Sequence, residues 1–269
     1  MRTAWCLLLM SAYDVVAPTF DNHRALPAGV PEAIRTAVLK STCASPRLLD
    51  LGAGSGRIGS PFVAAGDDYV AVDLSSGMLR EFAGRAAAHG RISPRLVRAD
   101  GELLPFRDAT FDAVMLIQVF GGLRGWRRFI AEARRVLRLP GAIVVGRTEM
   151  PQDGIDARMK QRLGAILGEL GAEKDRMNAR EDIAQWLESN AESSESVTAA
   201  TWTANRTPRG FIERHGSGAR FAALPVALKT QALRELGAWA AATFGSLDAA
   251  ASEPHAFELQ IFKFHNGNR

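Results

Sequence analysis

Over its first 150 residues the chain alternates short apolar runs with longer amphipathic stretches, and this alternation limits the folds open to it. Each apolar run is bounded by Gly, Pro or Asp, which predicts a strand. The predicted strands are Arg47–Leu51, Tyr69–Asp73, Arg95–Ala99, Phe111–Val119 and Ala142–Thr148. Strands separated by helices of this length need crossover connections, so we predict an α/β fold with a doubly wound, mostly parallel sheet.

Helical patterns separate these strands, and the regular alternation of strands and helices ends after about residue 150. Helices are predicted after Gly56, over Ser76–His89, over Trp126–Arg138 up to Pro140–Gly141, over Ile155–Leu170, over Arg180–Ser189 and over Pro225–Phe244. Two further strands are predicted over Ser196–Ala204 and Ala256–Phe264. We expect the last strand to pair antiparallel at the edge of the sheet.

A glycine-rich turn follows the first predicted strand, in the sequence Asp50-Leu-Gly52-Ala-Gly54-Ser-Gly56. Glycines let the backbone approach a ligand closely, and the amides at the start of the next helix suit a negative group. Ligands of open α/β sheets bind beyond the carboxyl ends of the strands. The turn therefore predicts a cofactor site.

Two cofactors fit such a turn. Gly54, Gly56 and Gly59 satisfy G-x-G-x-x-G, and Asp73 lies about 20 residues further on, as a nicotinamide dinucleotide site requires. The register D-x-G-x-G-x-G that begins at Asp50 instead resembles motif I of the class I methyltransferases that depend on S-adenosylmethionine (SAM). The stretch "DGELLPF" that begins at Asp100, with the later "FD", resembles the subgroup of ubiquinone and menaquinone biosynthesis methyltransferases (methyltransferase type 11). This resemblance extends from about Tyr13 to Thr148 and favours SAM.

The resemblance implies a Rossmann-like methyltransferase fold with a seven-stranded sheet and a helical cap. It implies one domain over residues 1–269, with an N-terminal arm or lid over 1–30 and cap helices over 151–250. In the family, the acid after the second strand holds the ribose, which corresponds to Asp73, and the acid after the third lies near the adenine amine, which corresponds to Asp100. The expected cofactor-binding residues are Asp50, Gly52, Ala53, Gly54, Gly56, Asp73, Leu74, Met78, Asp100, Gly101, Glu102 and Gln118.

The acceptor is predicted to be a small molecule, with S-adenosylhomocysteine (SAH) as the other product. The segment "LIQVFGGL" after the fourth strand lacks the Asn/Asp-Pro-Pro-Tyr/Phe motif of enzymes that methylate nucleic-acid or glutamine amino groups, and neither cysteine lies in a cytosine-methylation motif. The N-terminal "YDVVAPTFDNHRALPAG" resembles an arm that folds across SAM. Candidate catalytic residues are Tyr13, His23 and Gln118, and candidate substrate residues are Phe20, Arg24 and Phe120. Trp202, Trp239 and Phe211 are expected in the core of the cap.

The positive charge of the chain leaves alternative functions open. The net charge is +4 and arginines cluster in "LRGWRRFIAEARRVLRLPG", which predicts a helix with an apolar stripe and a basic, solvated face. An RNA methyltransferase, or a module that binds SAM without turnover, would also fit. No metal site is expected, no run reaches the roughly 18 apolar residues of a membrane span, and two cysteines in 269 residues are typical of a cytoplasmic protein. The sequence does not indicate an oligomeric state.

Overall fold

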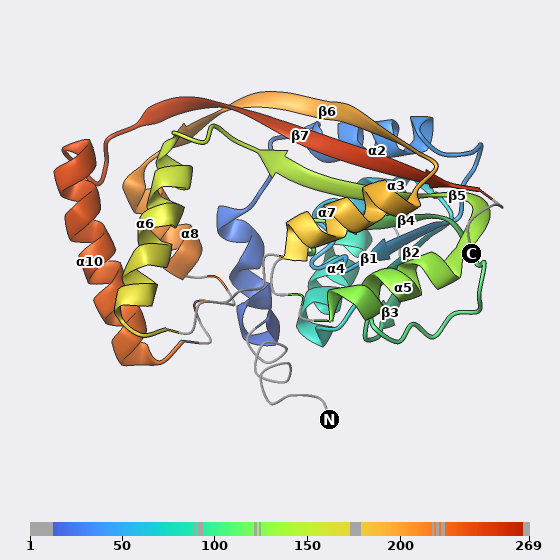
Figure 1. The fold of residues 1–269 in the computed structure, drawn as a ribbon, viewed down its shortest axis with the longest axis horizontal. Helices are drawn as coiled ribbons and strands as arrows, with labels where there is room; N and C mark the ends of the chain where they lie inside the picture. Colours follow the sequence, from blue (N-terminus) through green and yellow to red (C-terminus); the bar gives the residue numbers. More distant parts are fainter. Residues whose placement is uncertain are drawn as a thin grey trace. The chain divides into compact units, whose positions relative to one another are not determined.

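The structure, a computed structural model, describes residues 13–88, 90, 94–120, 123, 125–172, 179–216, 218, 221 and 224–265, without the side chains of 23 and 179. The chain forms two compact units, and Figure 1 shows its helices and strands. We call residues 26–148, 177–200 and 257–269 the sheet unit, and residues 1–25, 149–176 and 201–256 the helical unit.

Within the described residues, seven strands form one sheet in the order β3-β2-β1-β4-β5-β7-β6. Their bounds are β1 Leu48–Leu51, β2 Tyr69–Asp73, β3 Arg95–Arg98, β4 Phe111–Ile117, β5 Leu137–Glu149, β6 Ser193–Arg206 and β7 Ala251–Phe264. The pairs β3–β2, β2–β1, β1–β4 and β4–β5 are all parallel. The predicted doubly wound, mostly parallel sheet is confirmed.

Helices cover both faces of the strands in the sheet unit. α5 (Trp126–Val136) and α7 (Ala179–Asn190) pack on one face, in an apolar core that includes Leu49 and Leu51 of β1. Successive strand residues point to opposite faces, so Leu48 and Asp50 face the other layer. That layer consists of α2 (Val30–Lys40), α3 (Ser60–Ala65) and α4 (Ser76–Ala88), and α2 was not among the predicted helices.

Two expectations about this part of the chain are wrong, the end of α5 and the place of β7 in the sheet. α5 ends at Val136, two residues before the predicted end, and Leu137 already pairs with Phe111 of β4. Proline keeps the residue before it extended, which favours a strand, not a helix, up to Pro140. β7 lies between β5 and β6 and not at the edge, and apolar residues on both of its faces are buried. The edge strand β6 is largely exposed.

The helical unit contains η1 (Ala17–His23), α6 (Ile155–Glu169), α8 (Pro208–Gly216) and α10 (Val226–Phe244). α8 was not predicted. Asp156 in the first turn of α6 forms ion pairs with Arg206 and Arg214, and Glu253 of β7 accepts a hydrogen bond from the Ile155 amide at 2.7 Å. None of the described helices is both long enough and apolar enough to cross a membrane. The core of the unit contains Ile155, Met159, Leu163, Ile166, Phe211, Phe221, Ala232, Leu236 and Ala240.

An aromatic cluster lies under the glycine-rich turn of the sheet unit. Phe62 of α3 stacks on Tyr69 of β2, and Phe82 of α4 lies edge-on to Tyr69. A Cβ atom on Gly56 would lie 2.2 Å from the Phe82 ring, and Gly56 has a φ of +75°. This glycine is therefore required by packing and by backbone conformation together.

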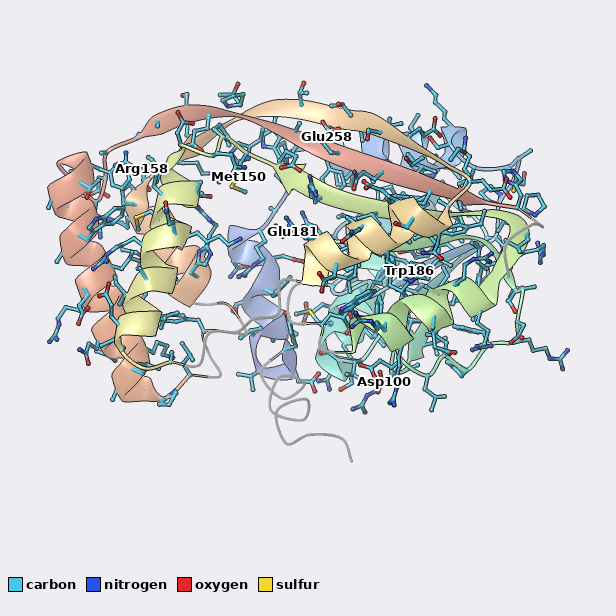
Figure 2. The ribbon with its side chains drawn as sticks, in the orientation of Figure 1. Asp100, Met150, Arg158, Glu181, Trp186 and Glu258 are labelled. Carbon is cyan, nitrogen blue, oxygen red and sulfur yellow. The ribbon has the colours of Figure 1, made fainter. Side chains whose placement is uncertain are left out.

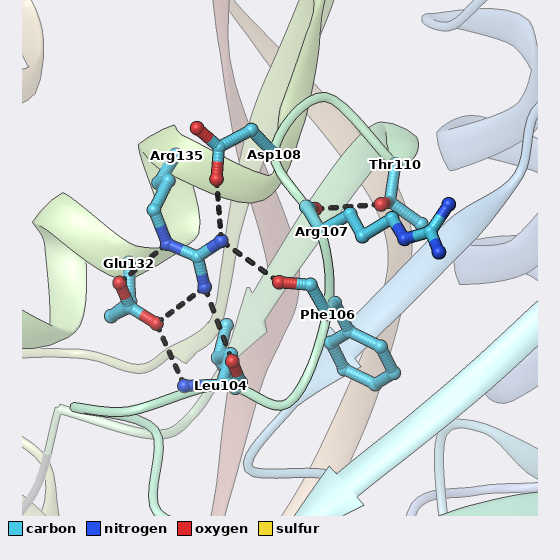
Figure 3. A network of polar contacts seen from close by, with 7 residues as sticks. All are labelled: Leu104, Phe106, Arg107, Asp108, Thr110, Glu132 and Arg135. Atoms are coloured by element: carbon cyan, nitrogen blue, oxygen red, sulfur yellow. Dashed lines mark hydrogen bonds and ion pairs between the residues drawn. The ribbon is translucent and has the colours of Figure 1, made fainter.

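A network around Arg135 of α5 holds the loop between β3 and β4 (Figure 3). The guanidinium donates to both carboxylate oxygens of Glu132 at 2.7 Å and to Asp108 at 2.8 Å. It also donates to the carbonyls of Phe106 and Leu104, while Glu132 accepts from the Leu104 amide. The hydrogen bond from Arg135 lowers the pKa of Glu132. The loop that follows Asp100 is thus fixed to α5.

We predict that Arg135→Gln lowers the free energy of unfolding by about 1 to 3 kcal/mol, because the Glu132 carboxylate loses two of its three donors and the carbonyls of Phe106 and Leu104 lose the guanidinium. Urea denaturation measures the change. Arg107→Gln in the same loop is the control, since Arg107 is exposed and its side chain points away from the network in Figure 3. Equal stability of the two variants would contradict the role given to Arg135.

Gly56→Ala is expected to cost at least about 2 kcal/mol of stability, since the methyl group meets Phe82 and the positive φ is unfavourable for alanine. Gly84→Ala in α4 is the matched control. Nothing lies within 4 Å of its Cβ position, so helix propensity should raise stability by up to about 1 kcal/mol. A Gly56 variant as stable as the wild type would show that the cluster adjusts freely.

Candidate functional site

The parallel strands bring the sequence-predicted acids to one edge of the sheet unit. β1 pairs with β2 and β4, and β2 pairs with β3, all in parallel. Asp73 ends β2 and pairs with Arg98 of β3, and Asp100 follows two residues later. The amide of Ala99 donates to the Asp73 carbonyl at 3.2 Å. Asp73 and Asp100, the latter labelled in Figure 2, therefore follow the carboxyl ends of adjacent strands.

The Asp73 carboxylate ties two loops together. Its Oδ2 accepts a hydrogen bond from the Gly54 amide at 2.9 Å, and its Oδ1 accepts from the Ser75 amide at 2.8 Å. The first bond fixes the turn after β1, and the second starts the turn that leads into α4. The carboxylate is half-buried, and a carboxylate has about four acceptor positions.

The glycines of the turn divide into two kinds. A Cβ on Gly52 would lie 2.4 Å from Val119, so Gly52, with φ +85°, is required by close packing. Gly54, with φ +59°, has nothing within 4 Å of its Cβ position. The backbone at Gly54 is thus open to a ligand and lies beside the Asp73 carboxylate.

Asp50 lies beneath the turn and is only 2% exposed. Its Oδ2 accepts a hydrogen bond from the Tyr69 hydroxyl, and its Oδ1 has no hydrogen-bond partner among the described residues. Burial raises the pKa of Asp50 to about 7, partly offset by the Tyr69 hydrogen bond. Asp50 therefore supports the turn from inside the core.

The loop after β3 carries the expected adenine-side residues. Asp100 accepts a hydrogen bond from the Glu102 amide at 3.0 Å. A Cβ on Gly101 would lie 2.4 Å from Phe129 of α5, so this glycine allows close packing of the loop. Burial and the nearby Asp100 raise the pKa of Glu102, while Arg128 and the Gly125 amide act in the opposite direction.

The remaining expected cofactor residues occupy different environments. Ala53 and Leu74 are half-buried in the turns after β1 and β2, and the Ala53 amide donates to the Val72 carbonyl at 3.0 Å. Met78 of α4 is 2% exposed, so its side chain belongs to the core. Their contact with a cofactor stays a prediction.

Gln118 follows β4 at the same edge in an unusual conformation, with φ +53°. Its Oε1 accepts from Arg57, which directly follows the glycine-rich turn, at 2.6 Å, and its Nε2 donates to the Thr148 hydroxyl of β5 at 3.0 Å. A positive φ in a residue other than glycine is strained and often marks a functional site. Sequence reasoning missed Arg57 and Thr148, because nothing in their local pattern links them to Gln118.

The candidate acceptor residues fall in both units. Phe120 is 8% exposed and belongs to the core of the sheet unit. In the helical unit, Tyr13 lies near Phe20 with ring centroids 6.2 Å apart, and the Arg24 guanidinium stacks on Phe20 and donates to the Arg214 carbonyl of α8. Arg24 thus holds η1 to α8. The side chain of His23 lies outside the described part of the structure.

An open hollow of about 680 Å³ lies in the helical unit. Its walls combine apolar side chains such as Met150 and Trp202 with threonines, and its lining residues are Glu149, Met150, Pro151, Thr201, Trp202, Thr203, Pro254, His255 and Ala256. Trp202 was expected in the core of the cap, yet it lines this hollow. Within the described residues, no group of three or more His, Cys, Asp or Glu side chains is placed to hold a metal ion.

We predict that stability falls between about pH 4 and pH 7 because of Asp50. Its folded-state pKa is about 7 and its ordinary value is 3.8, so the unfolded chain releases this proton first as pH rises. The favourable contribution of Asp50 to the free energy of unfolding is complete below about pH 4 and lost above about pH 7. Asp50→Asn, which still accepts from Tyr69, should flatten this part of the curve. Urea denaturation from pH 4 to pH 8 compares the two proteins, and identical slopes would contradict the prediction.

Comparison with known proteins places these features in a family. The family model described as a methyltransferase domain matches residues 49–145. The chain is 33% identical over 145 residues to a demethylmenaquinone methyltransferase of Renibacterium salmoninarum, a match that covers 53% of this chain and 59% of the relative. A demethylmenaquinone methyltransferase of Parafrankia sp. is 30% identical over 217 residues, covering 71% of this chain and 84% of the relative.

The matches differ in extent. The chain spans 58% to 63% of the length of the first three curated relatives. A solved SAM-dependent methyltransferase of Thermotoga maritima has the same fold, with a TM-score of 0.51 and 14% identity over 94% of this chain and 98% of that one. The SAM expected from the sequence is the cofactor of this family. The chain belongs to the class I SAM-dependent methyltransferases, in the subgroup related to the demethylmenaquinone methyltransferases.

Proposed function

We propose that this chain transfers a methyl group from SAM to a small-molecule acceptor. The observation that carries the proposal is the Asp73 carboxylate bonded to the Gly54 amide, beside a backbone that is open to a ligand. Asp73 accepts from the ribose hydroxyls, Asp100 and its loop border the adenine, and the turn from Gly52 to Gly56 borders the amino-acid part. Bound SAM supplies a methyl group on a positively charged sulfur, with a neutral leaving group.

The residues of the chain act by positioning the acceptor relative to the methyl group. Transfer of this kind needs an acceptor held in line and shielded from water more than it needs covalent help. Gln118 is the candidate for this role at the edge of the sheet, because Arg57 and Thr148 hold both ends of its amide. Tyr13, His23, Phe20, Arg24 and Phe120 remain candidates for closing over or contacting the acceptor.

A small acceptor of apolar or aromatic character fits best. The hollow in the helical unit has the volume typical of small-molecule sites and presents Trp202 and Met150. The relatives named demethylmenaquinone methyltransferases act, by that name, on a small molecule. We further propose a single functional domain over 1–269, with 1–30 as a lid and 151–250 as cap elements, and a cytoplasmic location.

The arginines of α5 and its C-terminal end favour this acceptor over RNA. Each of the five has a partner inside the sheet unit, and the pairing of Arg135 and Arg138 with carboxylates reduces the net positive charge of this face. Arg127 stacks on Trp126, Arg128 lies near Glu102, Arg134 stacks on Phe264, Arg135 binds Glu132 and Arg138 binds Asp112. A module that binds SAM without turnover remains the alternative to be tested.

The test combines binding and turnover. Calorimetry is expected to detect SAH and not NADH, and SAM with a labelled methyl group is expected to yield labelled product from a panel of phenols, quinols and small acids. Binding of NADH alone would overturn the assignment of SAM as the cofactor. SAH binding without any labelled product would favour the binding module, and transfer to RNA alone would favour the RNA enzyme.

Asp73→Ala is expected to weaken SAH binding by about 1.5 to 3 kcal/mol, because the ribose and the Gly54 amide lose a charged acceptor. Asp68→Ala is the matched control, since Asp68 precedes the other end of β2 and forms exposed ion pairs with Arg47 and Arg95. Exposed ion pairs of this kind contribute little to stability. Calorimetry measures both variants, and an unchanged affinity of the Asp73 variant would show that the ribose lies elsewhere.

A further inference from the structure

A cluster of charged side chains connects the elements of the helical unit. Arg24 follows η1, Asp156 lies in α6, Arg206 ends β6, Arg214 lies in α8 and Glu253 lies in β7. We call these five residues the polar cluster. Asp156 pairs with Arg206 at 3.4 Å and also with Arg214, and Arg24 donates to the Arg214 carbonyl at 3.0 Å. The packing of the unit therefore depends on these charges.

His255 of β7 lies beside the polar cluster with its side chain fully buried. Neither ring nitrogen has a hydrogen-bond partner among the described residues. The Nε2 atom lies 3.7 Å from Oε2 of Glu253, which is too far for a hydrogen bond. The Trp202 ring lies on another side, with ring centroids 5.7 Å apart. Burial without a hydrogen bond favours the neutral form of His255, because a buried charge needs a bonded partner.

The charges that face His255 act on it in both directions. Burial lowers its pKa, and Arg206 of β6 acts in the same direction. Glu253 of β7 and Asp156 of α6 act in the opposite direction. Burial is the largest of these causes, so the pKa of His255 lies below its ordinary value of 6.5. His255 is therefore neutral in the folded protein at neutral pH.

His215 of α8 faces the polar cluster from a different element. Its ring stacks on Phe211, with centroids 3.7 Å apart, and its Nδ1 lies 3.1 Å from the Phe211 carbonyl. Burial lowers the pKa of His215 to about 4, and Arg214 and Arg24 act in the same direction. The Phe211 carbonyl and Asp156 act in the opposite direction. A second histidine of the helical unit is thus held neutral.

These two histidines make the stability of the helical unit depend on pH. The unfolded chain binds both protons with the ordinary histidine pKa of 6.5, which is above the folded values. The unfolded state therefore binds more protons below about pH 6.5, and stability is lost as pH falls from there toward 4. Each bound proton also adds positive charge beside three guanidinium groups that face two carboxylates.

The buried acid of the sheet unit responds to pH in the opposite direction. Burial raises the pKa of Asp50 to about 7, so its contribution to stability grows as pH falls. Among the described side chains of the sheet unit, the one histidine is His265, which is exposed and lies 2.7 Å from Glu192. Acid therefore weakens the helical unit through groups that have no counterpart among the described residues of the sheet unit.

We propose that the helical unit is an acid-sensitive element, which loses its packing in mildly acidic solution when His215 and His255 are protonated, while the sheet unit stays folded. The inference goes beyond methyl transfer and does not depend on it. Trp202 contacts His255 and lines the hollow of the helical unit, so the same transition disrupts the hollow. A ligand held in the hollow would be released in acid.

Hydrogen exchange followed by mass spectrometry on the full chain tests the proposal at about pH 7.5 and about pH 5, with exchange times scaled to the intrinsic rate at each pH. Protection of α6 and α8 is expected to fall at least about tenfold at the lower pH, while protection of β1, β2 and β4 does not fall. The double variant His215→Gln and His255→Gln should lose this response. His265→Gln, which removes an exposed histidine, is the matched control and should keep it.

Nuclear magnetic resonance of the wild-type chain with labelled histidines gives a measurement that does not require the double variant to fold. Both His215 and His255 are expected to titrate below the ordinary histidine range. Titration of either one at its ordinary value would overturn the proposal. So would full protection of α6 and α8 at the lower pH, an equal loss of protection in both units, or an unchanged acid response in a folded double variant.

Discussion

The parallel pairing of β1 with both β2 and β4 is the constraint on which the site depends. Because the strands run in the same direction, the residues that follow them collect at one edge of the sheet unit. Asp73, Asp100 and Gln118, which are far apart in the sequence, reach that edge from three strands. One hydrogen bond, from the Gly54 amide to Asp73, then joins the turns after β1 and β2.

The glycine-rich turn shows how one sequence motif serves two physical purposes. Gly52 and Gly56 are required because Val119 and Phe82 occupy the space where a Cβ would lie. Gly54 has no such neighbour and leaves its backbone open. Beneath the turn, Asp50 is buried against the Tyr69 hydroxyl at an electrostatic cost that its raised pKa reflects. The turn is therefore shaped from below by the core.

The arginines have several different roles. The positive net charge first suggests a nucleic acid, yet Arg135 holds the loop that follows Asp100 and Arg138 pairs with Asp112. Arg24 holds η1 to α8 within the helical unit. Arg147 and Arg180 line a small pocket in the sheet unit. Total charge is consequently a poor guide to the partner of this protein.

The sequence by itself determined the strands, the glycine-rich turn and the positions of the acids after β2 and β3, because these features depend on local patterns within one strand–turn–helix unit. Only the tertiary structure decided which distant side chains meet. Asp50 reaches Tyr69, and Gln118 reaches Arg57 and Thr148, across separations of 19 to 61 residues. Likewise, β7 lies inside the sheet, and at its C-terminal end residues of both faces are buried, which its alternating sequence did not reveal. Side-chain contacts between strands depend on pairing and register, and neither is encoded in any single segment.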